Sequence, residues 1–224
     1  MEILNGKDMV PKFKTVMLYS RPGIGKTSAL GALPGRTLVV DIDRGTSVLA
    51  GNENVSIVQM DAELKVMSEV IEMLDRKCEF ENVCIDTLTE FERSMLAIKG
   101  KTGKNGGAPE MLHYNQVNYA VVSLVRRLRV LPVNVVLTAW LEYKDVIAID
   151  GSKYSQAQPM FSGKTADQVC GLCDIVGELM MNPKDDSRFV VFEPGPTRIA
   201  RDRIWKRKFC KPEDLLRGDM KEDA

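Results

Sequence analysis

The sequence predicts an α/β domain in which a mainly parallel β-sheet carries helices on both faces. Short apolar segments rich in β-branched residues alternate with longer segments of helical periodicity, the order that parallel strands and their crossover helices require. The strand segments are apolar almost throughout, as expected for strands that are buried on both faces. With 224 residues, of which 44% are apolar, the chain can form one sizeable core. We therefore expect a single domain over residues 1–224.

The predicted strands are bounded by turn residues such as Pro34-Gly35. The segment 143–158 is expected to form a hairpin that turns at Asp150-Gly151. In chain order the predicted strands are 14–20, 37–41, 55–60, 82–86, 133–139, 175–180 and 188–192, with a turn at 182–186 between the last two.

Apolar residues at helical spacing predict the helices. The clearest case is 62–74, whose apolar face consists of Leu64, Met67, Val70, Ile71 and Leu74. Further helices are expected over 88–98 and 114–130, on either side of a Gly- and Lys-rich loop at 100–109. The polar tail over 212–224 is expected to be peripheral.

Composition excludes several classes of protein. Lys plus Arg and Asp plus Glu each number 31, so any site for nucleic acid or an acidic membrane must be a local patch. No segment reaches the roughly 20 consecutive apolar residues of a membrane-spanning helix, and the first residues lack the pattern of a signal peptide. Five cysteines in a chain of this length do not form a disulfide framework. We therefore expect a cytoplasmic protein with no membrane partner.

The segment Ser20–Thr27 has the sequence S-R-P-G-I-G-K-T. It matches the phosphate-loop pattern G-x-x-x-x-G-K-[ST] at every fixed position except the first, where Ser20 replaces glycine. A strand is expected before the loop and a helix after it, so that backbone N–H groups and the helix N-terminus face the phosphates of a nucleotide. The residues expected to contact the nucleotide are Ser20, Arg21, Pro22, Gly23, Ile24, Gly25, Lys26, Thr27 and Ser28.

Three side chains are expected to act on the phosphates and on a metal ion. Lys26 is the cation placed to reach the β- and γ-phosphates, and the Thr27 hydroxyl is placed to ligate Mg²⁺. The apolar strand 82–86 ends in Asp86, which has the Walker B form and is expected to hold Mg²⁺ through a water shell. These residues predict ATP and Mg²⁺ as the ligands.

The carboxylate that activates water does not follow Asp86 directly, because the next residue is Thr87. The end of the second strand offers Asp41 and Asp43, which period-2 alternation places on the same face. A carboxylate at this edge of the sheet can orient the attacking water. We expect Asp43 to have this catalytic role; the alternative is a turn or capping residue before Gly45.

The order of these motifs resembles that of the RecA-like ATPase core. A phosphate loop precedes an acidic strand end, a Walker B strand, an apolar strand that ends at Thr138, and a basic A-R-D-R segment. More closely, the chain resembles the small single-domain RecA-like nucleotide-binding proteins of phages, some of which are assigned to recombination and single-strand annealing. The resemblance covers about residues 12–209 and implies a three-layer P-loop NTPase with a RecA-like, mainly parallel sheet.

The resemblance also implies a function. It implies an ATPase that acts on single-stranded DNA in phage recombination or annealing, in the host cytoplasm, with a recombination or single-strand-binding protein as partner. Asp43 stands where RecA-like enzymes usually carry a catalytic glutamate, so turnover is expected to be slow. Arg201 and Arg203 match basic positions that, in RecA-like oligomers, reach the nucleotide of the neighbouring subunit. A homo-oligomer is therefore expected.

The segment 198–211 is strongly basic, with Asp202 as its one acid and with Trp205 and Phe209 between its basic residues. This pattern favours contact with a phosphate backbone and stacking on single-stranded bases. The alternative is a solvated basic edge with Trp205 in the core. A second, smaller basic patch consists of Lys99, Lys101 and Lys104.

Cys170 and Cys173 form a C-x-x-C pair, but His113 is the single histidine and no second pair is present. A zinc site needs about four ligands, so we expect both cysteines to pack in the core from a helix. His113 is expected at the surface or at a helix start.

Two other functions stay open at this point. A nucleotide or nucleoside kinase also uses a phosphate loop and a basic lid, although no acceptor pocket can be identified from the sequence. A nucleotide-gated binding module with negligible turnover is favoured by Asp43 in place of glutamate.

Overall fold

The computed structural model describes residues 12–61, 64–76, 78–148 and 150–218. Its centre is a ten-stranded sheet with the order β10-β8-β7-β1-β5-β4-β2-β3, in which β6 pairs with β5 and β9 pairs with β7. The strands are β1 Thr15–Ser20, β2 Thr37–Asp41, β3 Val55–Gln59, β4 Asn82–Asp86, β5 Asn134–Ile147, β6 Lys153–Pro159, β7 Ile175–Met181, β8 Arg188–Val191, β9 Arg201–Asp202 and β10 Phe209–Cys210.

The strands from β7 to β3 are parallel to one another, whereas β6, β8 and β9 run antiparallel to their partners. All five residues of β2 and of β4 are buried, as the near-continuous apolar segments predict. Because parallel strands end at the same edge, the loops after β1, β2 and β4 meet on one side of the sheet.

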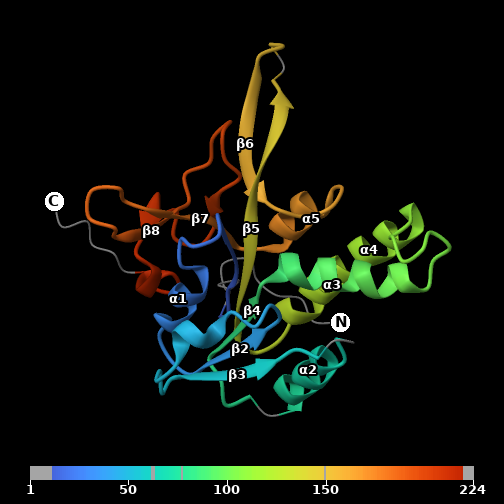
Figure 1. Ribbon diagram of the computed structural model, residues 1–224. Helices are drawn as coiled ribbons and strands as arrows, with labels where there is room; N and C mark the ends of the chain where they lie inside the picture. Colours follow the sequence, from blue (N-terminus) through green and yellow to red (C-terminus); the bar gives the residue numbers. More distant parts are fainter. Residues whose placement is uncertain (1–11, 62–63, 77, 149, 219–224) are drawn as a thin grey trace, which may run out of the picture.

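Helices cover both faces of the sheet (Figure 1). They are α1 Lys26–Gly31, α2 Val66–Arg76, α3 Leu88–Lys101, α4 Met111–Arg129 and α5 Thr165–Leu172, with 3-10 turns at Thr46–Leu49 and Pro212–Asp214. The start predicted for the helix 62–74, at residues 62–63, lies outside the described residues. None of the helices in the described ranges combines the length and the apolar character needed to cross a membrane.

Alternate residues of each central strand point to opposite faces, and this divides the core into two clusters. In β1, Val16 and Leu18 pack with Leu30 of α1. Met17 and Tyr19 pack on the other side, in the cluster to which α2, α3, α4 and α5 contribute. The fold is therefore a three-layer α/β arrangement with helices on both faces, which confirms the predicted fold class.

One predicted strand is much longer in the structure. The segment expected to end near Thr138 and Ala139 continues as β5 to Ile147 and pairs with β6 in an antiparallel ribbon that projects from the domain (Figure 1). The predicted hairpin is confirmed, since the Gly151 N–H donates to Ala148 O at 2.9 Å. The segments predicted as a strand to Ala139 and a separate hairpin arm are thus one continuous strand.

The prediction of a peripheral tail from Pro212 is wrong for its described part. Leu215 is fully buried and Leu216 is 8% exposed, and both pack in the core cluster on the α1 side of the sheet. The physical reason is that this polar segment contains two adjacent leucines, and burying their side chains is favourable. Residues 219–224 of the predicted tail lie outside the described residues.

We predict that Leu215→Ala lowers the free energy of unfolding by about 2–5 kcal/mol, because the substitution leaves a cavity in a packed core. The measurement is urea denaturation followed by circular dichroism. Leu112→Ala is the matched control, since Leu112 is 60% exposed and its loss should change stability by less than about 0.5 kcal/mol. Equal effects of the two substitutions would show that the C-terminal segment is not part of the core.

Candidate functional site

The loop between β1 and α1 has the backbone that the phosphate-loop pattern requires. Gly23 has φ 81° and Gly25 has φ 102°, which are left-handed values that favour glycine. Ser20, the position that departs from the pattern, is the last residue of β1 and is buried. Its hydroxyl donates to the carbonyl of Arg21 at 3.0 Å. Serine is accommodated there because the strand extends through this position and no left-handed turn begins at it.

The side chain of Lys26 lies along this loop and is 7% exposed. Its Nζ donates to the Ser20 carbonyl at 3.1 Å, to the Ser20 hydroxyl at 3.3 Å and to the Arg21 carbonyl at 3.3 Å. Burial lowers the pKa of Lys26, and the nearby carboxylates of Asp86 and Asp43 oppose that shift. None of its described hydrogen-bond partners carries a charge, so the ammonium is held in place while its charge is left for an anion.

Asp86 joins the loop to the sheet. Its Oδ2 accepts a hydrogen bond from Thr27 Oγ1 at 2.6 Å, and its Oδ1 accepts one from Thr138 Oγ1 at 2.5 Å. Asp86 is fully buried, so both oxygens depend on these hydroxyls. The strand order makes the arrangement possible, because β5, which carries Thr138, lies between β1 and β4.

The donor set at this point suits Mg²⁺. The hydroxyl of Thr27 and the carboxylate of Asp86 are adjacent oxygen ligands at the end of the loop, and Mg²⁺ takes oxygen ligands from one or two protein groups together with phosphates and water. Thr27 and Asp86, the predicted metal residues, therefore fit that ion.

The two carboxylates after β2 have different surroundings. Asp41 is fully buried and accepts hydrogen bonds from Thr46 Oγ1 at 2.6 Å and from the Gly45 N–H at 3.1 Å, so it stabilises the turn that follows β2. Asp43 is exposed and also accepts from the Gly45 N–H, at 3.1 Å. The contacts of Asp43 are thus compatible with either role: orienting the attacking water, as predicted, or stabilising the turn before Gly45.

Asp43 lies within electrostatic reach of the other acidic groups of the site. Partial burial raises its pKa, and the negative charges of Asp86, Asp41 and Glu90 raise it further, while the Gly45 N–H lowers it. Asp43 and Asp86 both act on the pKa of Lys26 as well. The structure therefore brings the predicted residues Lys26, Asp43 and Asp86 together at one edge of the sheet and adds Glu90 of α3 to them.

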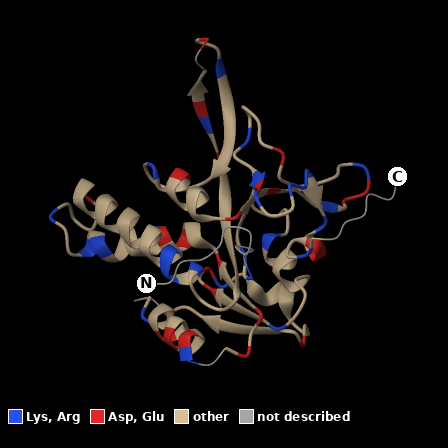
Figure 2. Ribbon diagram, turned by 180° about the vertical axis from the view of Figure 1, so that it is seen from behind, with Lys and Arg blue, Asp and Glu red and all other residues tan. Residues whose placement is uncertain are grey.

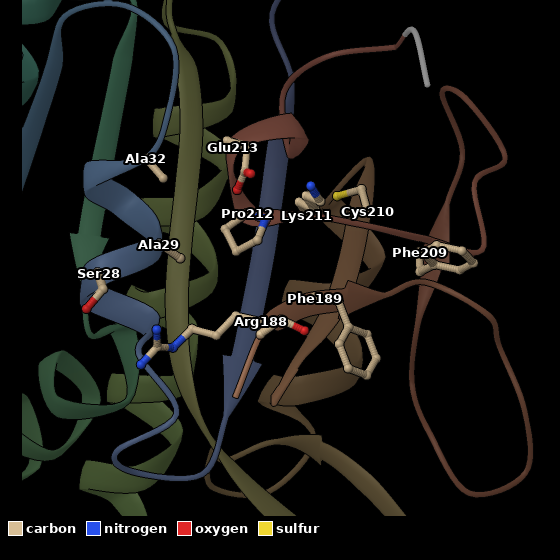
Figure 3. Close-up of a pocket in the computed structure, with 11 residues that line it drawn as sticks. Ser28, Ala29, Ala32, Arg188, Phe189, Phe209, Cys210, Lys211, Pro212 and Glu213 are labelled. Atoms are coloured by element: carbon tan, nitrogen blue, oxygen red, sulfur yellow. The ribbon is translucent and has the colours of Figure 1, made fainter. Parts of the chain in front are cut away.

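Arg188 contacts the phosphate loop and was missed in the sequence. It begins β8, and its Nε donates to the Ile24 carbonyl at 2.7 Å. It approaches so closely that a side-chain carbon at Gly25 would lie 2.6 Å from Arg188 Nε. The register places Arg188 opposite Met181, the last residue of β7, and its side chain extends toward the first turn of α1 (Figure 3). No local pattern marks it, because a hairpin of the sheet brings it across more than 160 residues of sequence.

The loop also contacts the projecting ribbon. The guanidinium of Arg21 lies 5.4 Å from the centre of the Tyr143 ring, and its Nη2 donates to the Tyr143 hydroxyl at 3.4 Å. Tyr143 belongs to the part of β5 that extends beyond the core. The predicted nucleotide-contacting residue Arg21 therefore faces the ribbon.

Arg201 and Arg203 lie far from the phosphate loop of their own chain. Arg201 pairs with Val176 near the start of β7, and its guanidinium donates to the carbonyls of Cys170 and Cys173 at the end of α5. This capping role does not fit a free arginine that reaches a neighbour. Arg203 is exposed, so the predicted role in trans stays a prediction that now depends on Arg203.

Most arginines of the basic segment 198–211 have internal partners. Arg198 pairs with Glu178 at 2.5 Å, and Arg207, whose side chain is 7% exposed, pairs with Asp202 at 2.6 Å. Trp205 is partly buried against the core. Figure 2 shows basic and acidic residues interspersed over this part of the domain. The exposed basic residues of the segment are Arg203, Lys206, Lys208 and Lys211, of which Lys208 forms an exposed ion pair with Glu193 at 3.6 Å.

The remaining expectations concern Cys170, Cys173 and His113. Both cysteines are buried in the core cluster, Cys170 within α5 and Cys173 at its end, as predicted. His113 lies in the first turn of α4, where its Nδ1 accepts from the Glu110 N–H at 3.0 Å. Its place at a helix start is confirmed, and it is buried.

The fold and the loop geometry define a P-loop nucleotide-binding domain. The sequence matches the AAA domain family over residues 12–204, and the chain therefore belongs to that family. This membership makes it a nucleotide-binding domain of the ATPase class. No curated protein matches the sequence.

Solved structures with similar folds include two ATPases and a recombinase. An ATPase from the type III secretion system of pathogenic bacteria has 15% identity and a TM-score of 0.47, over 75% of this chain and 52% of that chain. The ATPase EscN from enteropathogenic E. coli has 16% identity and a TM-score of 0.47, over 75% and 43%. The RadB recombinase has 16% identity and a TM-score of 0.47, over 80% and 79%. This chain thus spans about half the length of each of the first two.

We predict that Lys26→Ala weakens binding of a nucleoside triphosphate at least about 100-fold, because it removes a buried ammonium whose described hydrogen-bond partners are all uncharged. The measurement is isothermal titration calorimetry with Mg²⁺ and ATP. Lys153→Ala, on the ribbon, is the matched control and should bind normally. A folded Lys26→Ala protein with unchanged affinity would contradict the assignment of the loop.

Proposed function

We propose that this protein binds ATP with Mg²⁺, hydrolyses it to ADP and phosphate, and acts with single-stranded DNA in phage recombination or annealing. The observation that carries the proposal is the arrangement of Lys26 beside the hydrogen-bonded set Thr27, Asp86 and Thr138. It combines a cation that hydrogen-bonds only to uncharged oxygens among the described residues with oxygen ligands at the end of a glycine-rich loop.

The residues of the loop have separate tasks in this proposal. The Lys26 ammonium pairs with the β- and γ-phosphates, while left-handed Gly23 and Gly25 let the backbone approach them. Thr27 and Asp86 hold Mg²⁺, which when bound neutralises charge on the phosphates. Thr138 fixes the orientation of the Asp86 carboxylate by its hydrogen bond to Oδ1.

Asp43 is the proposed base. Water attacks the γ-phosphorus, the bond to the oxygen that bridges to the β-phosphate breaks with its electron pair left on ADP, and the proton of the water passes to the Asp43 carboxylate. Partial burial and the charge of Asp86 raise the pKa of Asp43, which makes its carboxylate a stronger base than an ordinary aspartate. Its side chain is one methylene shorter than glutamate, which supports slow turnover.

A second candidate is a nucleotide-gated binding module with negligible turnover. The exposed position of Asp43 and its hydrogen bond to the Gly45 N–H favour it, because that bond also suits a turn residue. The two candidates differ in product formation, since the module would bind ATP without releasing phosphate.

We predict that Asp43→Asn lowers the rate of ATP hydrolysis about 10²–10⁴-fold and changes ATP affinity much less, because a general base acts on the chemical step. Phosphate release and equilibrium binding are measured on the same preparation. Glu90→Gln tests the carboxylate of α3 that acts on Asp43 in the same cluster. If Glu90→Gln abolishes hydrolysis and Asp43→Asn does not, the base is Glu90; if the unmodified protein releases no phosphate, the binding module is correct.

The DNA part of the proposal depends on a narrower surface than the sequence indicated. Arg198, Arg201 and Arg207 have internal partners, so the exposed lysines of the segment would carry the backbone contacts. Phe209 is 62% exposed at the same edge and is available for stacking on a base. A recombination or single-strand-binding protein as partner, and a homo-oligomer in which Arg203 reaches the neighbouring nucleotide, complete the proposal.

We predict that the double substitution Lys206→Glu and Lys208→Glu weakens binding of a single-stranded oligonucleotide, because both lysines are exposed. Binding by the unmodified protein should fall with salt at a log–log slope of roughly −0.7 per phosphate contacted. Fluorescence anisotropy measures both effects, and Lys144→Glu with Lys153→Glu on the ribbon is the matched control. Affinity that is independent of salt would argue against a backbone contact.

A further inference from the structure

The root of the ribbon, where β5 and β6 leave the sheet, is held by a threonine of α3. The ladder between the two strands runs to Leu141 and Pro159, and its register continues to Trp140 opposite Met160. The Met160 N–H donates to the Trp140 carbonyl at 2.7 Å, as in a regular antiparallel pair. The reciprocal bond is replaced by a bridge through a side chain. The Trp140 N–H donates to Thr89 Oγ1 at 3.0 Å, and this hydroxyl donates to the Met160 carbonyl at 3.2 Å.

The hydroxyl of Thr89 is therefore fixed by the backbone of both strands. Thr89 is 1% exposed, so its hydroxyl depends on these two groups. It uses one acceptor and one donor function at once, which gives the bridge a single geometry. The start of α3 is thereby tied to the point at which the ribbon leaves the domain.

This bridge lies close in the chain to the carboxylate of the candidate metal site. Thr89 follows Asp86 by three residues, and Trp140 follows Thr138 by two. The bond between Asp86 and Thr138 and the bond between Thr89 and Trp140 thus join the same two short stretches of chain. One hydrogen bond alone allows rotation about itself, whereas two fix an orientation. Thr89 therefore determines how the junction of β4 and α3, with Asp86, lies against β5.

Two further residues of α3 hold the same root. The guanidinium of Arg93 lies 4.4 Å from the centre of the Trp140 ring, and its Nη2 contacts the Met160 sulfur at 3.1 Å. Glu92 is 3% exposed and accepts hydrogen bonds from the Ser162 N–H at 3.0 Å and from the Ser162 hydroxyl at 2.8 Å. The first turns of α3 therefore contact β5, the end of β6 and the segment that follows it.

We propose that Thr89 is a positioning residue for the Mg²⁺ site. Its hydroxyl bridge holds the start of α3 against the ribbon root and so keeps the Asp86 carboxylate beside Thr27. The proposal rests on the binding of a nucleotide with Mg²⁺ at the phosphate loop. It assigns a role to a residue that touches neither the nucleotide nor the metal ion, and it makes the ribbon root part of the framework of the nucleotide site.

Thr89→Val tests the proposal, because it keeps the shape of the side chain and removes the hydroxyl. The probe is ADP, whose dissociation constant is measured by calorimetry once with Mg²⁺ and once with EDTA. The ratio of the two constants reports the contribution of the metal ion. We expect Thr89→Val to lower this ratio about 10-fold, as loss of an outer partner of a metal ligand commonly does. Affinity in EDTA should change less than about 2-fold, since Lys26 and the loop are untouched.

Two controls separate positioning from a general effect on the fold. Thr89→Ser retains the hydroxyl and should keep the ratio within about 2-fold of the unmodified protein. Thr165→Val alters a threonine that is equally buried, at 1% exposure, and whose hydroxyl has no hydrogen-bond partner among the described residues. It should also leave the ratio unchanged. A lower urea midpoint for Thr89→Val with an unchanged ratio in the folded protein would show a structural role alone and would overturn the proposal.

Arg93→Gln is a second variant that does not depend on a buried substitution. Arg93 is exposed, so the protein should fold, and the loss of its contacts loosens the root from the α3 side. We expect the ratio to fall about 3-fold, less than for Thr89→Val, because the hydroxyl bridge remains. Arg126→Gln, at an exposed arginine of α4, is the matched control and should keep the ratio. If Thr89→Val does not fold, Arg93→Gln decides the question.

The outcomes distinguish this inference from the proposed function. If the unmodified protein does not bind ADP, or binds it equally with Mg²⁺ and with EDTA, the proposed Mg²⁺–nucleotide site fails and this inference fails with it. If Mg²⁺ strengthens binding but neither Thr89→Val nor Arg93→Gln lowers the ratio, the site stands and the positioning role is overturned. If Thr89→Ser lowers the ratio as much as Thr89→Val, the hydroxyl is not the cause and the role is likewise overturned.

Discussion

A single buried carboxylate determines how the site is assembled. Asp86 accepts one hydrogen bond from Thr27 at the start of α1 and one from Thr138 in β5. A carboxylate buried without such partners would be costly, so the loop, β4 and β5 must keep one relative position. The strand order allows both contacts, because β5 lies between β1 and β4, and together they hold the phosphate loop, with Lys26, against the sheet.

The sequence predicted the layers of the fold because the buried strands are almost wholly apolar and alternate with helical segments. It did not predict the length of β5, because the charged residues Glu142, Lys144 and Asp145 follow the apolar segment and the turn signal Asp150-Gly151 suggests a separate hairpin. It also missed the buried C-terminal leucines, since Leu215 and Leu216 stand in a polar segment. These contacts depend on which apolar surface of the core remains uncovered by the rest of the chain, and the composition of the segment does not contain that information.

The residues of the candidate site likewise fall into those that the sequence predicts and those that it does not. Lys26, Thr27 and Asp86 follow local patterns, because a loop that surrounds phosphate oxygens and a strand that ends in a carboxylate each need contiguous residues. Arg188 has no such pattern, since only the pairing of β8 with β7 carries it to the loop. For the basic segment, the sequence predicted more free charge than the structure offers. Arg201 binds backbone carbonyls and Arg207 binds a carboxylate inside the domain, and a count of charges along the sequence does not reveal these contacts.

The length of β5 has a mechanical consequence. At about 3.3 Å per residue, its 14 residues measure roughly 46 Å. Residues 134–140 of this strand pair with β1 and β4 inside the sheet, whereas residues 141–147 pair with β6 alone. The ribbon is therefore anchored at the end that carries Thr138. A molecule bound along the ribbon would contact the same strand that supplies the hydrogen-bond partner of Asp86.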